Sequence, residues 1–169
     1  MRVVVDDLAF FDSDAIVRPA TARLDPTTPA LRRLEQLGGP VFLERLTVQR
    51  DLPVGAAVVT GAGGDLPAEF VIHAIIQSQT EPVSSHGVAQ AWRAALKQAQ
   101  EWEFAHVSAP PLGIGAGNLT LEDAAEIMVL ELTAHRTQFP FPKAITLVVE
   151  NDLERDVFEA ALRKGSAQS

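Results

Sequence analysis

Glycines at positions 113, 115 and 117 mark the segment of this sequence best suited to bind a phosphate. The segment directly follows an apolar run at 107–112 and directly precedes a helical pattern that begins near Thr120. Glycine lets backbone N–H groups approach an anion closely, and a helix N-terminus adds partial positive charge. A tight turn can need glycine for its dihedral angles alone, but the strand–turn–helix context favours phosphate binding. The candidate residues are Gly113, Ile114, Gly115, Ala116, Gly117 and Asn118.

Strand-like and helix-like patterns alternate along the rest of the chain. We expect strands at 2–5, 14–17, 56–60, 70–75, 106–112 and 144–149, the second of them ending at Pro19. We expect helices after Thr28, at 86–101, at 120–135 and at 152–162, the first of them stopping near Gly38 and Gly39. This order predicts an α/β fold, a three-layer α/β/α sandwich with a mixed, mostly parallel central sheet.

Length and composition are typical of one domain with a full-sized core. The chain has 169 residues, of which 47% are hydrophobic, and we expect a single domain over 1–165 with a disordered tail at 166–169. The formal net charge of −8 argues against nucleic acid as a partner. Cysteine is absent and no apolar run approaches a membrane span, so we expect a cytoplasmic protein without a membrane partner. The four histidines lack metal-ligand spacing, so no metal site is predicted.

Ligands of parallel α/β sheets bind beyond the carboxyl ends of the strands. The residues that directly follow each predicted strand are therefore the ones to inspect. They are Asp6 and Asp7, the segment from Arg18 to Arg23, the glycine segment 113–118, and Glu150 with Asn151.

Four segments stand in the order of a known family's motifs. Asp7-Leu8 takes the place of a Gly-Asp-Ile motif, and residues 14–24 look like an Asp-Ala-Ile-Val-Asn-Ala-Ala-Asn-x-x-Leu segment. Residues 66–73 closely match Leu-Pro-Ala-(Lys/Arg)-Tyr-Val-Ile-His, and residues 111–117 resemble an Ala-Leu-Gly-Thr-Gly-x-x-Gly loop in which Ile114 replaces the hydroxyl residue and Asn118 stands near the last glycine. Together these segments resemble the macro domain, an ADP-ribose-binding module, from about Val3 to Leu162.

This resemblance implies binding of ADP-ribose or a related adenine nucleotide, with no further cofactor. Asp7 would accept a hydrogen bond from the adenine amino group, with the Leu8 backbone beside the purine. The glycine segment 113–118 would wrap the diphosphate and approach the distal ribose. Asn151 stands where many members place an aromatic against adenine, and Thr21 stands where the family has an asparagine that contacts the distal ribose.

The first loop departs most from the family pattern. The family's first asparagine is Arg18 here and the second is Thr21. Its glycine triplet is replaced by Asp-Pro-Thr-Thr-Pro at 25–29, where proline lacks an N–H donor. In hydrolytic members this loop positions the attacking water, and the loss of several positioning groups predicts weak or no hydrolase activity.

Structural explanations compete for several of these residues. Asp7 could simply end a strand and cap a turn, and Thr21 could serve only the loop. His73 lies within an apolar strand, which favours a satisfied core histidine. Arg18 and Arg23 could pair with phosphate across the cleft, although ordinary solvent-exposed arginines are slightly favoured.

Three hypotheses about function follow. The first is a divergent ADP-ribose-binding domain with weak or no catalysis. The second is an ADP-ribosyl or phosphate-ester hydrolase in which Thr21 or Asp25 orients water. The third is an interaction or scaffold domain that kept the fold but not the ligand pocket, with a homo-oligomer as one form it could take.

Overall fold

One twisted sheet forms the centre of the computed structural model, which describes residues 1–46, 51–115 and 119–167. Within this part of the chain six strands run in the order β1-β6-β5-β2-β4-β3. All neighbours are parallel except β3, which is antiparallel to β4 at the sheet edge. The strands are β1 (Arg2–Val5), β2 (Ala15–Thr21), β3 (Ala57–Gly61), β4 (Phe70–Gln77), β5 (His106–Ala109) and β6 (Ala144–Val149).

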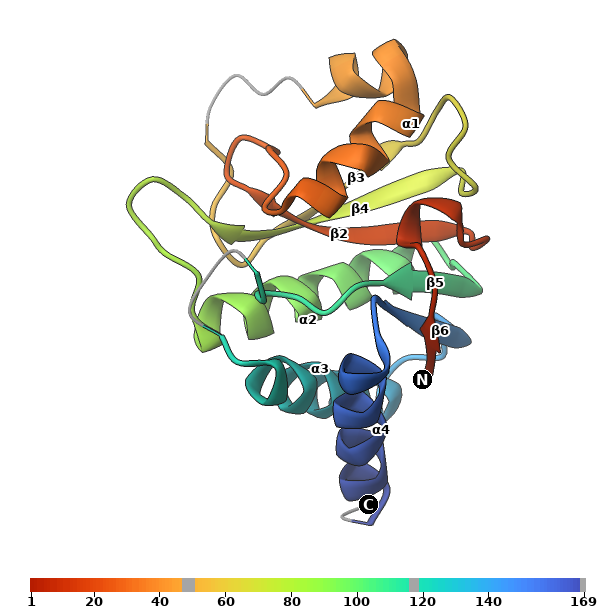
Figure 1. The fold of residues 1–169 in the computed structure, drawn as a ribbon, viewed down its shortest axis with the longest axis vertical. Helices are drawn as coiled ribbons and strands as arrows, with labels where there is room; N and C mark the ends of the chain where they lie inside the picture. The colour runs from red at the N-terminus through yellow and green to blue at the C-terminus, as the bar shows by residue number, and fades with distance from the viewer. Residues whose placement is uncertain (47–50, 116–118, 168–169) are drawn as a thin grey trace.

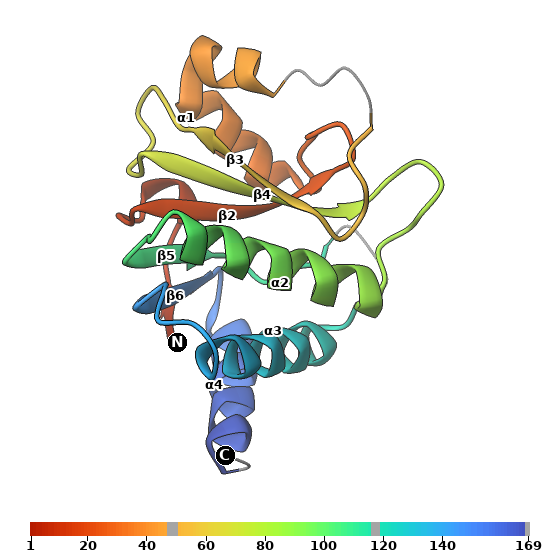
Figure 2. The ribbon, with the colours of Figure 1, turned by 180° about the vertical axis from the view of Figure 1, so that it is seen from behind.

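Helices cover both faces of the sheet. On one face, α1 (Pro29–Arg45) and the short 3₁₀ helix η1 (Leu8–Phe10) pack their apolar side chains onto β2 and β4. The other face carries α2 (Ser85–Glu101) and α3 (Leu121–Arg136), while α4 (Asp152–Ala167) packs on α3, β1 and β6. Figure 1 shows α1 in front of the sheet, and Figure 2 shows α2 in front of it from behind. The predicted three-layer α/β/α fold is confirmed.

β2 is buried along almost its whole length because both of its faces are covered. The expectation that this strand ends at Pro19 is wrong, since β2 continues to Thr21. β5 pairs with β2 only at Ala15 and Ile16, so at Pro19 that neighbouring strand has already ended. A proline is tolerated in a strand where a ladder bond is not required.

Three other elements end three or more residues away from the expected position. α1 bends at Gly39 (φ 76°, ψ −176°), as the predicted stop requires, but a second helical segment opens at Pro40 and runs to Arg45. β5 ends at Ala109 instead of residue 112. α4 runs past residue 162 to Ala167, and 168–169 lie outside the described residues.

Within the described ranges, no helix has both the length and the apolarity to cross a membrane.

Arg18 is a completely buried charged side chain in the middle of β2. Its Nε donates to His73 Nδ1 (2.8 Å), its Nη1 to Glu35 Oε1 (3.0 Å), and its Nη2 to the carbonyl of Leu24. Burial lowers the pKa of Arg18 from its ordinary value, and the carboxylates of Glu35 and Asp25 oppose that shift. The expectation of a solvent-exposed arginine is therefore wrong here. Arg18 instead joins β2 to β4, to α1 and to the turn after β2.

His73 completes this network and is the satisfied core histidine that its apolar strand predicts. An arginine Nε can only donate, so Nδ1 of His73 is the acceptor and Nε2 carries the ring proton. Nε2 then donates to Thr60 Oγ1 at 2.8 Å, which links β4 to β3. Burial, with the charge of Arg18 in second place, holds the pKa of His73 well below its ordinary 6.5.

Replacing Arg18 with methionine should destabilise the protein strongly, because the Glu35 carboxylate and the Leu24 carbonyl lose their buried partner. We expect a loss of about 3–5 kcal/mol in the free energy of unfolding, measured by urea denaturation. The matched control is Arg23→Gln, which removes an exposed ion pair with Asp51 (3.0 Å) and should change stability by about 0–1 kcal/mol. Equal effects of the two substitutions would contradict a central role for Arg18.

Stability should also decrease in mild acid through His73. In the unfolded chain the imidazole binds a proton as the pH falls through about 6.5, whereas the buried ring stays neutral. Below pH 6.5, protonation of the unfolded chain therefore lowers the free energy of unfolding by up to about 1.4 kcal/mol per pH unit. Above pH 6.5, His73 adds no pH dependence to the free energy of unfolding. Urea denaturation from pH 7.5 to 5.5 should show a steeper decline for the wild type than for His73→Gln. An NMR titration that protonates His73 in the folded protein near pH 6.5 would contradict this.

Candidate functional site

A cavity of about 740 Å³ lies at the carboxyl ends of β1, β6, β5 and β2. Its volume falls within the range of about 300–1,000 Å³ that is usual for small-molecule sites. This is the edge of the sheet at which the strand order predicts a ligand. The lining includes Asp6, Asp7, Leu8, Pro19, Thr28, Leu31, Arg33, Leu34, Pro110, Pro111, Ile114, Gly115, Glu150 and Glu154.

Asp7 lies at one end of this cavity and has two structural partners. Its Oδ1 accepts a hydrogen bond from the N–H of Ala9 (3.0 Å), which caps the short helix η1 and presents Leu8 to the cavity. Its Oδ2 forms an ion pair with Arg33 Nη1 at 2.5 Å. Asp7 therefore caps a turn, as its structural explanation expects, and also lines the cavity.

The glycine segment also lines this cavity, through Ile114 and Gly115. Gly113 and Gly115 both have positive φ angles (89° and 79°), a conformation that favours glycine. A Cβ on Gly113 would lie 2.5 Å from Leu119 Cδ1, so this glycine is needed for packing as well. Ile114 and Gly115 line the cavity, and a Cβ on Gly115 would lie 3.4 Å from Thr28 Cγ2. The other three predicted residues, Ala116, Gly117 and Asn118, lie outside the described residues.

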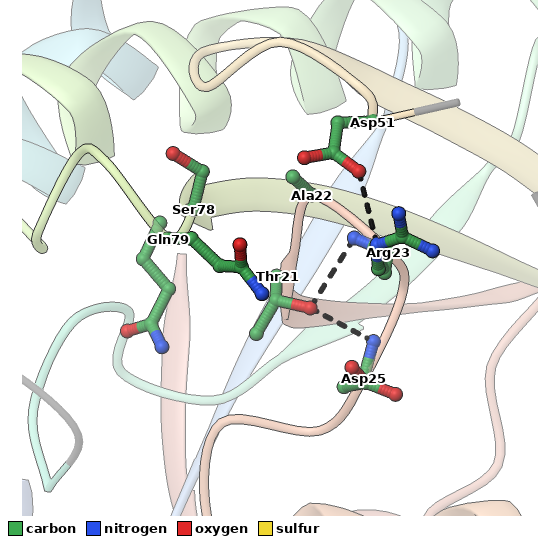
Figure 3. A pocket seen from close by; sticks show the side chains of 8 residues that line it. Thr21, Ala22, Arg23, Asp25, Asp51, Ser78 and Gln79 are labelled. Atoms are coloured by element: carbon green, nitrogen blue, oxygen red, sulfur yellow. Dashed lines mark hydrogen bonds and ion pairs between the residues drawn. The ribbon is translucent and has the colours of Figure 1, made fainter.

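Thr21 lines a different and smaller hollow of about 230 Å³ at the ends of β2 and β4. Figure 3 shows its hydroxyl directed at the backbone of the following turn. There Oγ1 accepts from the N–H groups of Arg23 (3.3 Å) and Asp25 (3.1 Å), while Arg23 pairs with Asp51. The structure thus brings Asp7, Leu8, Ile114 and Gly115 to one cavity and places Thr21 in another.

Asn151 caps the N-terminus of α4. Its Oδ1 accepts from the N–H of Glu154 (2.9 Å), and the Glu154 carboxylate accepts in return from the N–H of Glu150 (3.3 Å). This reciprocal arrangement holds the entry to the helix. Asn151 itself is exposed, and the flanking Glu150 and Glu154 are the residues of this segment that line the cavity.

Helix α1 supplies a wall that sequence reasoning missed. Thr28, Leu31 and Leu34 line the cavity at a spacing of three residues, which places them on one helix face, and Arg33 lies beside them. The apolar spacing was visible in the sequence, but nothing showed which element this face would meet. Arg18, through Glu35, holds α1 in that orientation.

The charge around the cavity is mainly negative. Among the described lining residues, Arg33 is the single cationic side chain, and the cavity also carries the carboxylates of Asp6, Asp7, Glu150 and Glu154. A phosphate would therefore depend on backbone N–H groups, on the N-terminus of α1 at Thr28, and on Arg33. In the described part of the chain, no three His, Asp or Glu side chains are grouped to hold a metal ion.

The family model of the macro domain matches residues 17–128 of this chain. The chain therefore belongs to the macro domain family. This assignment agrees with the confirmed fold and with a cavity between the Asp7 and Gly115 segments.

Similarity to known proteins covers nearly the whole chain. An uncharacterised protein of Mycobacterium tuberculosis is 30% identical over 94% of this chain, which spans only 44% of that relative's length. An O-acetyl-ADP-ribose deacetylase of Klebsiella pneumoniae is 28% identical, with 93% of this chain and 86% of the enzyme covered. A mutant macrodomain of Oceanobacillus iheyensis solved with ADPR superposes with a TM-score of 0.86 at 20% identity, covering 99% of this chain and 93% of the other.

Proposed function

We propose that this macro domain binds ADP-ribose or a related adenine nucleotide in the large cavity. The observation that carries the proposal is that Asp7 and Gly115, from segments more than a hundred residues apart, line the same cavity. The base would lie against Asp7 and Leu8, with its exocyclic amino group donating to the Asp7 carboxylate. The diphosphate would lie near Ile114 and Gly115.

Two features of the cavity near Ile114 and Gly115 support this orientation of the nucleotide. Positive φ angles at Gly113 and Gly115 turn the backbone sharply beside the cavity, in a segment without side-chain bulk at those positions. Thr28, at the start of α1, lies against Gly115, and the first turn of α1 contains no acidic residue. A helix N-terminus whose first turn carries no carboxylate favours an anion.

The relatives supply further support. The Klebsiella enzyme is named for an ADP-ribose derivative, and the structure of a Trypanosoma brucei macrodomain in complex with ADP-ribose has the same fold (TM-score 0.83, 17% identity). These names describe those proteins. The cavity described above carries the proposal for this chain.

Calorimetric titration with ADP-ribose should show micromolar binding to the wild type. Asp7→Ala should weaken it about tenfold, because a hydrogen bond to a charged acceptor is lost, and should abolish the preference for ADP over uridine diphosphate. Asp12→Ala is the matched control, since Asp12 is exposed and does not line this cavity. Absence of binding to the wild type, or an Asp7→Ala variant with unchanged affinity and base preference, would refute the proposed site.

We further propose that catalysis is weak or absent. The Thr21 hydroxyl accepts two backbone hydrogen bonds in a turn, and Arg18 is buried with all its described contacts inside the protein. Neither side chain lines the cavity that would hold the nucleotide. Positioned groups that orient water, on which hydrolysis depends, are therefore missing from these two positions.

Incubation with O-acetyl-ADP-ribose should produce ADP-ribose no faster than buffer alone, as followed by chromatography. Thr21→Ala and Asp25→Ala should give the same result. Turnover by the wild type that either substitution removes would establish the hydrolase alternative in place of the binding domain.

A further inference from the structure

Arg33 is the cation best placed to decide which ligands the cavity accepts. It lies on α1, its guanidinium reaches the Asp7 carboxylate, and four acidic side chains share the cavity with it. A phosphate ligand that enters this cavity is repelled by these carboxylates. Among the described lining residues, Arg33 is the one side chain whose positive charge can attract the phosphate.

The ion pair between Arg33 and Asp7 is suited to exchange. The side chains are 56% and 37% exposed, and pairs of this kind contribute only about 0–1 kcal/mol to stability. The helix backbone beneath Arg33 is held in place, because Glu35 two residues later pairs with the buried Arg18. A change of partner therefore requires only a side-chain rotation.

Arg33 and the glycine segment line the same cavity, the latter through Ile114 and Gly115. Thr28, which lies against Gly115, begins the α1 wall, and Arg33 follows five residues later, about 7.5 Å along the helix axis. Side chains on a helix point toward its N-terminus, so a long arginine side chain at this position can extend toward the glycine segment. Its planar guanidinium can then donate two parallel hydrogen bonds to a phosphate.

We propose that Arg33 makes the site selective for nucleotides that carry a diphosphate. In the free protein Arg33 pairs with Asp7. When the nucleotide binds, the amino group of the base takes the Asp7 carboxylate, and Arg33 transfers to the diphosphate. This inference rests on the proposed function and adds a residue that determines ligand charge.

Calorimetry with two ligands, adenosine and ADP, tests the exchange. The wild type should bind ADP more tightly than adenosine. Arg33→Gln should weaken ADP binding about tenfold, the usual effect of losing a charged hydrogen-bond partner, and should leave adenosine binding unchanged or stronger because Asp7 is released. Arg33→Lys should recover part of the ADP affinity. Arg32→Gln is the control, since it removes the same charge from an exposed neighbour that does not line the cavity.

Each contrary result has a distinct meaning. If Arg33→Gln weakens adenosine and ADP equally, Arg33 only positions Asp7, and the exchange is wrong. If Arg32→Gln and Arg33→Gln weaken ADP binding equally, general charge explains the effect and the exchange is again wrong. A wild type that binds neither ligand would overturn the proposed function itself, together with this inference.

Discussion

The shape of the site depends on the hydrogen bonds made by the buried guanidinium of Arg18. A charge removed from water must be hydrogen-bonded on every side, and here the partners come from β4, from α1 and from the turn after β2. Satisfying Arg18 therefore fixes three elements relative to β2 at once. The orientation of α1 follows, and with it the helix face that forms a wall of the cavity.

The same constraint shapes the first loop. The carbonyl of Leu24 accepts from Arg18, and Leu24 itself has a positive φ of 67°, so the turn folds back onto the strand. Thr21 holds the turn from within through its hydroxyl. The loop is thus organised around the protein interior, whereas the large cavity is lined by α1, the Asp7 turn and the glycine segment.

Alternating strand and helix patterns were sufficient to predict the layers and the sheet type, because burial on both faces leaves a clear apolar signal. The rule that ligands bind beyond the carboxyl ends of the strands located Asp7, Ile114 and Gly115 at one end of the sheet, and Leu8 was added by the family resemblance. It could not predict that Arg18 is buried, because a single arginine in an apolar strand gives no indication of partners such as Glu35 that are distant in sequence. That Arg33 lines the cavity could not be predicted for a related reason: the rotation of α1 is set by tertiary contacts and not by its own weak periodicity.

The decisive measurement is a crystal structure of the protein soaked with ADP-ribose. We expect density for adenine beside Asp7 and Leu8 and for the diphosphate beside Ile114 and Gly115, within the 740 Å³ cavity. Ligand density in the hollow around Thr21 with the large cavity empty, or no density at a saturating concentration, would contradict it.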